Sequence, residues 1–202
     1  MIKRLSHQPI LTGIGLLMTA IVLLAMISML SSAFIAETTE GLATAINQSG
    51  SLRMQSYRIG VALADESEPA SIRAVNAAAL TKEFEARLES PRLVDAIYGQ
   101  TDNAVSRTYK RIKQLWQQSM TPPLSAHIEL LAGDAARGTQ ALPRADYLAG
   151  VDAFVAEIDK LVRLLEDVAE RRIDILRTIQ AVSLALTVVI VVVTMTLVLR
   201  DG

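Results

Sequence analysis

The chain contains no cysteine, only two histidines and few aromatic residues (4%). Without cysteine the protein can form no disulfide, and thiolate metal ligands and cysteine nucleophiles are excluded as well. Two histidines are too few for a zinc cluster of the usual ligand spacing. The formal net charge of −1 gives no sign of the basic face that nucleic-acid binding requires. We therefore predict no metal site, no cofactor and no nucleic-acid partner.

Charged residues are missing from two long stretches, because no Asp, Glu, Lys or Arg occurs in residues 5–36 or 178–199. A bilayer core of about 30 Å is spanned by about 20 apolar residues in a helix, so each stretch predicts a transmembrane helix. A cleaved signal peptide, starting at Lys3 and Arg4 and ending near Ser31-Ser32-Ala33, is the alternative for the first stretch. Its apolar run, residues 9–30, exceeds the roughly 7–15 residues of a signal peptide, which favours an uncleaved anchor.

The charged flanks predict the orientation of the chain in a membrane. Lys3 and Arg4 should stay in the cytoplasm by the positive-inside rule. We expect a cytoplasmic N-terminus (1–8), a transmembrane helix (9–36), a periplasmic sensor domain (37–177), a second transmembrane helix (178–200) and the start of a cytoplasmic part (201–202). We therefore expect a multi-pass protein of the bacterial inner membrane, in contact with membrane lipid. Because two residues follow the second helix, we expect a piece of a longer receptor; a small accessory membrane protein is the alternative.

The middle region predicts packed helices. All acidic residues except Asp201 lie in it. Steps of three and four separate the members of two apolar series, which is the spacing of helices packed on one another. The two series are Ile35, Thr38, Leu42, Ala45, Ser49, Leu52, Ser56, Ile59, Leu63 and Val151, Phe154, Ile158, Leu161, Leu165, Val168. The second continues past Arg172 through the apolar stretch, which predicts one unbroken helix.

Prolines divide the rest of this region. We expect helices over 37–64, 71–88 and 101–119, a turn over 93–98, a short helical piece over 125–131 and a loop over 133–138. The third helix should end at Pro122-Pro123. No segment shows the alternation of a strand. The predicted fold is all-α: a membrane-anchored antiparallel four-helix bundle whose first and last helices are continuous with the transmembrane helices.

Two arginines in the first predicted outside helix suggest a binding site. No acidic residue lies between Gly41 and Ala64, so Arg53 has no carboxylate one turn away. At about 100° per residue, Arg58 lies about 140° around the helix from Arg53, so one chain cannot aim both at one small ion. A cross-helix salt bridge from Arg53 to Glu129 or Asp152 is the ordinary alternative.

Two arginines could bind one small ion if two copies of the chain packed through the Arg53 face. The two-fold axis of such a homodimer would place Arg53 opposite its own copy. A small planar anion between the two guanidinium groups would accept charge-assisted hydrogen bonds from both. The same face should carry Ile46, Ser49, Gly50 and Tyr57. Of the other candidates, we expect Met54, Tyr57 and Trp116 in the core and His127 on the surface or in a loop.

Residues 50–58, Gly-Ser-Leu-Arg-Met-Gln-Ser-Tyr-Arg, closely resemble the P-box of the nitrate/nitrite sensor histidine kinases. The likeness extends upstream to Ala45-Ile46-Asn47, and the motif follows the first apolar stretch as in that family. The resemblance implies that nitrate, or nitrite, binds at the dimer interface through Arg53, with backbone contact from Gly50. It assigns Arg58 a supporting role, and we place Asn47, Ser49 and Tyr57 with it. The family commonly has Lys at the position of Gln48 and often His at that of Thr44.

The resemblance predicts the transmembrane sensor module of a two-component nitrate/nitrite receptor. Binding should shift one helix and pass a signal to a kinase domain of the same parent chain, and from there to a response regulator. The chain itself carries no kinase signature, so we expect no enzyme activity in it. Two alternatives stay open: the sensor region of a methyl-accepting chemotaxis or pilus-type transducer, and a structural membrane protein without a ligand.

Overall fold

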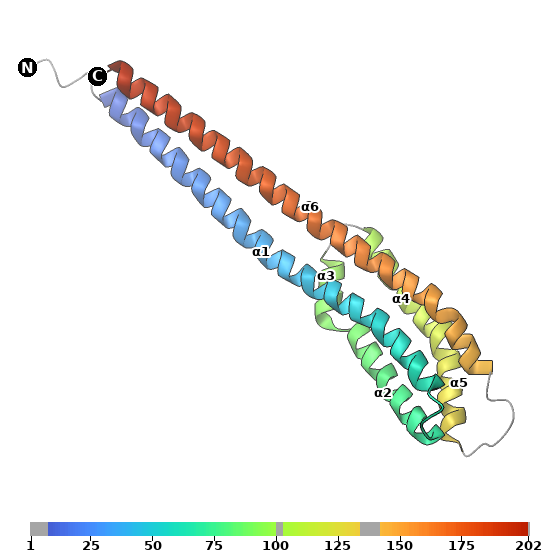
Figure 1. Ribbon diagram of the computed structural model, residues 1–202. Helices are drawn as coiled ribbons and strands as arrows, with labels where there is room; N and C mark the ends of the chain where they lie inside the picture. The colour runs from blue at the N-terminus through green and yellow to red at the C-terminus, as the bar shows by residue number, and fades with distance from the viewer. Residues whose placement is uncertain (1–7, 100–102, 134–141, 202) are drawn as a thin grey trace, which may run out of the picture. The chain divides into compact units, whose positions relative to one another are not determined.

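A computed structural model describes residues 8–99, 103–133 and 142–201, and these residues contain helices and no strand (Figure 1). The longest helices are the first and the last, α1 (Gln8–Ala64) and α6 (Leu142–Asp201). Between them lie α2 (Ala70–Leu88), α3 (Pro91–Tyr98), α4 (Asn103–Leu115), the π-helical segment η1 (Trp116–Met120) and α5 (Thr121–Ala132). The predicted all-α fold is confirmed, and so is the continuity of the first and last helices.

Some predicted features lie outside the described residues. They are the N-terminal Lys3 and Arg4, the first two residues of the predicted third helix, most of the predicted 133–138 loop, and Gly202.

The chain divides into two compact units, one made of residues 1–39 with 170–202 and the other of residues 40–169. In the first unit, the described parts of α1 and α6 carry large apolar side chains that are exposed, such as Leu16, Leu30, Val188 and Met195. Both helices are long and apolar enough to cross a membrane, judged by length and composition. Exposed apolar surface of this kind is favourable in lipid and unfavourable in water.

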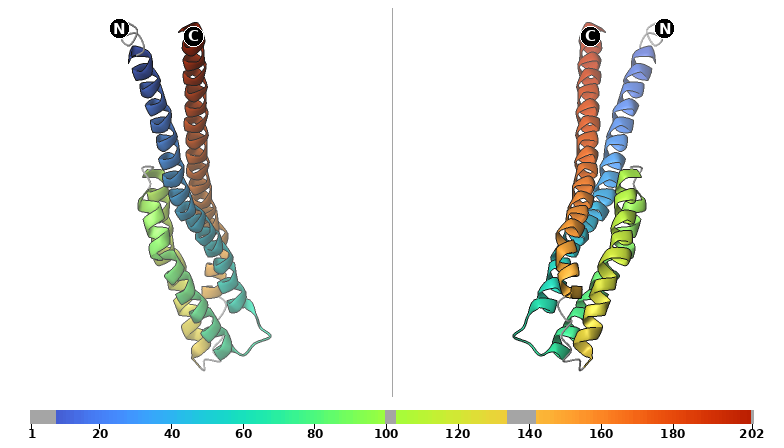
Figure 2. Two further views of the ribbon diagram at one scale, coloured as in Figure 1. Left: turned by 90° about the vertical axis from the view of Figure 1, so that its left-hand side faces the viewer. Right: turned by 90° about the vertical axis from the view of Figure 1, so that its right-hand side faces the viewer.

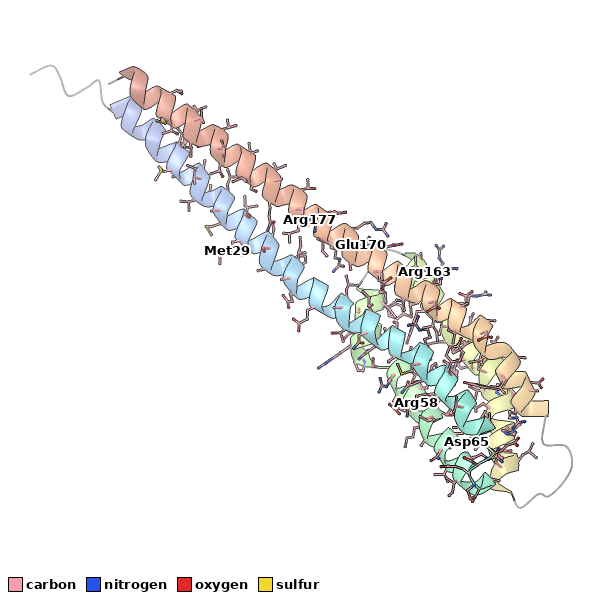
Figure 3. All side chains as sticks on the ribbon, viewed as in Figure 1. Met29, Arg58, Asp65, Arg163, Glu170 and Arg177 are labelled. Carbon is pink, nitrogen blue, oxygen red and sulfur yellow. The ribbon has the colours of Figure 1, made fainter. Side chains whose placement is uncertain are left out.

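The second unit is a four-helix bundle built around one core. Residues 40–64 of α1, α2 with α3, the continuous run α4–η1–α5, and residues 142–169 of α6 lie side by side with alternating direction (Figures 1 and 2). The two predicted apolar series line this core, because every member from Leu42 to Leu63 and from Val151 to Val168 is buried. Side chains fill the spaces between the helices of this unit (Figure 3).

Residues next to the helix ends explain two connections in the second unit. Helix α1 ends at Ala64, before the Asp65–Pro69 segment, as predicted. The segment after α2 is a complete helix, α3, rather than a turn, because Ser90 caps it by accepting a hydrogen bond from the Leu93 backbone N–H and Pro91 occupies its first turn.

The prediction that Pro122-Pro123 ends the third helix is wrong. The chain continues from α4 through η1 into α5, and both prolines stand in the first turn of α5, where the missing N–H groups have no intrahelical partner to lose. The wider π-turn bridges the two helices, since the Thr121 N–H donates to the Trp116 carbonyl, five residues back. Helix α5 also includes the predicted 125–131 piece.

The predictions about the burial of four single residues were partly correct. Trp116 is buried as predicted, stacked near Phe84 with ring centroids 4.0 Å apart. His127 is buried rather than on the surface, because α5 continues the bundle and turns this side chain inward. Met54 and Tyr57 are exposed rather than in the core, because they lie outside the buried series of α1.

Candidate functional site

The side of α1 that faces away from the bundle carries a second regular series. We call Ala43, Asn47, Gly50, Met54, Tyr57, Val61 and Ala64 the outer face of α1; their spacing alternates between four and three. All are exposed except Gly50, which is half-buried, and Met54 and Val61 expose 65% and 66% of their surface. A small and apolar series at this spacing is typical of a helix that packs against another helix. Within the described residues of one chain, most of this face is exposed.

Arg53 lies directly beside the outer face and forms an ion pair across to α6. Its Nη1 is 2.8 Å from Oδ1 of Asp159, and the two side chains are 51% and 34% exposed. In the single chain the guanidinium therefore forms a cross-helix salt bridge, as the ordinary alternative expected, but the acid is Asp159 rather than Glu129 or Asp152. The reason is distance in sequence: Asp159 lies 106 residues away on a neighbouring helix, where inspection of the one-turn neighbours on α1 cannot find it.

The Arg53–Asp159 contact leaves much of the guanidinium available. Among the described residues it is the one polar contact of Arg53, and it uses Nη1 alone. An arginine has five N–H donors. Ion pairs this exposed to solvent contribute about 0–1 kcal/mol to stability, so an incoming anion can replace the carboxylate at small cost.

Tyr57 forms a second contact between the same two helices. Its hydroxyl donates a 2.9 Å hydrogen bond to Oδ1 of Asp152. This hydrogen bond is the main reason that the pKa of Tyr57 is raised above its ordinary value, and the negative charges of Asp152 and Asp159 add to the effect. Arg53 and Tyr57 are one turn apart on α1, and their two carboxylate partners are two turns apart on α6.

Arg58 lies on the opposite flank of the outer face. It is exposed, and it has no ion pair within the part of the chain that the structure describes (Figure 3). Arg53 directly precedes Met54 and Arg58 directly follows Tyr57, so the two arginines border the outer face on its two sides, as their predicted angular separation requires.

Gly50 is not explained by packing within the chain. A methyl group added there would meet no atom within 4 Å, whereas at Gly60 it would lie 3.0 Å from Leu148 of α6. Gly60 therefore permits close packing inside the bundle, while the missing side chain of Gly50 opens the outer face beside Arg53.

Two of the predicted supporting residues, Asn47 and Ser49, differ in their exposure to solvent. Asn47 is exposed on the outer face, whereas the Ser49 hydroxyl is fully buried without a hydrogen-bond partner. Ser49 belongs to the core series of α1 that also contains Leu52 and Ser56, whereas Arg53 is exposed.

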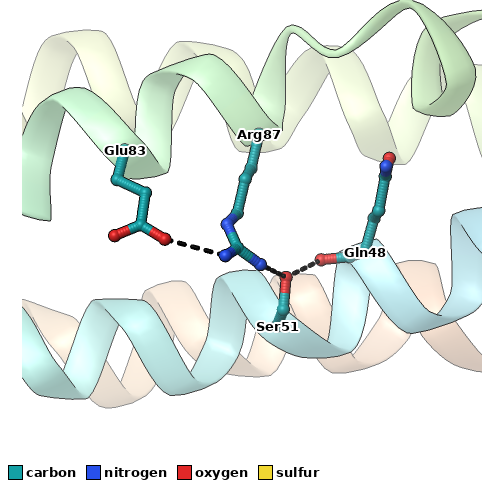
Figure 4. Close-up of polar contacts among 4 residues, drawn as sticks. All are labelled: Gln48, Ser51, Glu83 and Arg87. Atoms are coloured by element: carbon teal, nitrogen blue, oxygen red, sulfur yellow. Dashed lines mark hydrogen bonds and ion pairs between the residues drawn. The ribbon is translucent and has the colours of Figure 1, made fainter.

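Gln48, where the resembling family commonly has Lys, ties α1 to the α2–α3 junction. Its side-chain Oε1 accepts a 2.7 Å hydrogen bond from the Ser90 hydroxyl, and its backbone carbonyl accepts one from Ser51. Arg87 of α2 donates to the Ser51 hydroxyl and pairs with Glu83 (Figure 4). An arginine of α2 that is paired with Glu83 therefore lies beside this part of α1. Sequence inspection missed Arg87 because nothing near it in the chain marks it.

No group of three or more His, Asp or Glu side chains that could hold a metal ion occurs among the described residues.

The match with a family model extends over residues 34–142, more than half of the chain. The model is that of the N-terminal region of type IV pili methyl-accepting chemotaxis transducers, and the chain belongs to this family. Among curated proteins, it is similar to the nitrate/nitrite sensor protein NarX of Escherichia coli strain K12, with 27% identity over 199 residues. The NarX proteins of E. coli O157:H7 and Shigella flexneri match to the same extent.

These alignments cover 96% of this chain and 29% of NarX, so the chain spans less than a third of the length of the curated relatives it matches. The family and the two candidate membrane helices together identify a membrane signalling protein, and this chain is its sensor or transducer N-terminal module.

Proposed function

We propose that this module senses nitrate, or nitrite, by binding one anion between two copies of the chain that pack through the outer face of α1. The observation that carries the proposal is the position of Arg53, a half-exposed arginine at the border of an uncovered helix face with heptad spacing. Arg53 is the principal ligand, Gly50 offers its backbone, and Arg58, Asn47 and Tyr57 support the site.

The heptad pattern supports a parallel pairing of two α1 helices. Met54 and Val61 repeat at one heptad position and Gly50 and Tyr57 at the other, with Asn47 as the polar member that fixes register in such pairs. Arg53 and Arg58 occupy the two positions that flank this seam. Four guanidinium groups would then gather near the two-fold axis and repel one another.

An anion at that axis would relieve the repulsion. A small planar oxyanion presents its oxygen atoms in the plane of a guanidinium fork, and charge-assisted hydrogen bonds of this type are about twice as strong as neutral ones. Nitrate fits this description. The nine-residue run that resembles a P-box and the similarity to a nitrate/nitrite sensor support nitrate over other planar anions.

The signal would pass through α1 or α6, because each continues without an assigned break from the bundle into a candidate membrane helix. A ligand that favours one arrangement of two packed helices over another shifts the population between them. We propose that the bundle is periplasmic, over residues 37–177, with transmembrane helices over 9–36 and 178–200 in the inner membrane.

The output domain has two candidates, each with its own support. The similarity to NarX favours a sensor histidine kinase acting on a response regulator, and the family match favours a methyl-accepting transducer. The sequence of the parent gene beyond Gly202 would distinguish the two.

Titration calorimetry of the purified chain in detergent micelles tests the site. Sodium nitrate should bind the wild type, sodium chloride should not compete at equal concentration, and Arg53→Ala should abolish binding. Arg58→Ala should weaken binding without abolishing it, since Arg58 supports the site.

Arg163→Ala is the matched control, because Arg163 is another exposed arginine of the bundle, on α6 (Figure 3). It should bind nitrate like the wild type. Equal nitrate binding by the wild type and Arg53→Ala, or none by the wild type, would refute the proposal.

A further inference from the structure

We infer that Asp159 is a built-in competitor for the anion, so that ligand binding exchanges the Arg53–Asp159 ion pair within one chain for an Arg53–anion contact between chains. The inference rests on the proposed anion site, and it assigns that site a residue that sets its affinity. Asp159 belongs to α6, far outside the P-box motif.

The geometry defines the competition. The carboxylate of Asp159 is 2.8 Å from Nη1 of Arg53, which is the distance at which an oxyanion would accept the same N–H. The Asp159 carboxylate and the oxyanion are both negatively charged, so they cannot accept from the same N–H of Arg53 together. The free state thus holds a carboxylate where the bound state holds an oxygen of the ligand.

The surrounding charge strengthens the effect. Asp152 lies two turns from Asp159 on α6 and accepts a hydrogen bond from Tyr57, the neighbour of Arg53 one turn along α1. A free anion that approaches Arg53 therefore meets two carboxylates from α6. Repulsion from like charges lowers its affinity unless Asp159 withdraws.

Displacement of Asp159 also has a mechanical consequence. The Arg53–Asp159 pair and the Tyr57–Asp152 hydrogen bond are two exposed side-chain contacts that join α1 to α6 on this side of the bundle. Ligand binding would release the first of them. The helices α1 and α6 are the ones that continue into the candidate membrane helices. The anion would therefore bind more tightly to the arrangement of α1 and α6 in which Asp159 has released Arg53 than to the arrangement in which the ion pair is intact.

Asp159→Asn tests the inference, since it keeps the shape of the side chain and removes its charge. In nitrate titrations of the full chain, this variant should bind about two- to fivefold more tightly than the wild type, which is the effect of removing one exposed competing ion pair. Asp159→Glu should bind like the wild type, because it keeps a competing carboxylate.

Glu157→Gln is the matched control. It removes one negative charge and one ion pair of α6, that with Arg111 at 3.4 Å, but leaves Arg53 and Asp159 intact. Its nitrate affinity should not change. A similar gain in this variant would show a general charge effect and overturn the inference.

The outcomes separate the two proposals. If the wild type binds nitrate and Arg53→Ala does not, but Asp159→Asn binds no more tightly than the wild type, then Asp159 does not compete with the anion. The inference then fails and the proposed function stands. If neither the wild type nor Asp159→Asn binds nitrate, the proposed function itself fails.

Discussion

The two sides of α1 between residues 40 and 64 have similar spacing and opposite surroundings. The inner side buries Leu42, Leu52, Ile59 and Leu63, while the outer side exposes Met54, Tyr57 and Val61. Burial of the inner side stabilises the bundle of one chain, at about 25 cal/mol per Å² of apolar surface. The outer side contributes little to that bundle, and we propose that its regular spacing serves a contact with a second chain.

The largest expected effect is on stability and comes from the inner side. Ile59→Ala should lower the free energy of unfolding of the bundle by about 2–5 kcal/mol, because it leaves a cavity in the core. Val61→Ala, two residues away on the outer face, should change it by less than about 0.5 kcal/mol in the dilute single chain. Urea unfolding followed by the fluorescence of Trp116, the one tryptophan, measures both. An equal loss of unfolding free energy in the two variants would contradict the difference between the inner and outer sides of α1.

The second effect concerns self-association. Val61→Lys should weaken dimer formation at least about tenfold, since a two-fold contact would bury two like charges without partners. Val75→Lys is the control, because Val75 of α2 is as exposed (68%) as Val61 (66%) and lies off the outer face. Analytical ultracentrifugation in detergent measures the dimer dissociation constant. An equally strong dimer in both variants would place the interface elsewhere.

The smallest effect is the titration of Tyr57. Its hydrogen bond to Asp152 raises its pKa above 10.0, so the contact stabilises the fold below pH 10 and is lost as the pH rises through the folded-state value. Asp152→Asn removes the charge that disfavours the phenolate and should lower this pKa. Ultraviolet difference absorbance follows the phenolate, with Tyr57→Phe identifying its share of the signal. An unchanged pKa in Asp152→Asn would mean that this contact is not formed in solution.

Helix type and core were predictable from sequence because they depend on local periodicity. The series from Leu42 to Leu63 and from Val151 to Val168 reported the buried sides directly. The positions at which helices end were less predictable. Pro69 lies beyond the end of α1 at Ala64 and precedes α2, but Pro122 and Pro123 do not end a helix, because they stand in the first turn of α5 after a π-turn.

The candidate site was predictable as far as it lies on one helix. Arg53, Gly50 and Arg58 stand in one motif, and their angular relation follows from helical geometry. Asp159 and Asp152 are about a hundred residues away, and their contacts with Arg53 and Tyr57 depend on how α6 packs against α1. Burial also corrected single residues: Tyr57 was expected in the core although it is not a member of the apolar series, and it is exposed.

The stoichiometry of nitrate binding tests the central claim most directly. If two copies of Arg53 share one anion at a two-fold axis, calorimetry of the purified wild-type chain should give one nitrate bound per two chains. Arg53→Ala should give none under the same conditions. One nitrate per chain, or heat that is unchanged in Arg53→Ala, would contradict the account.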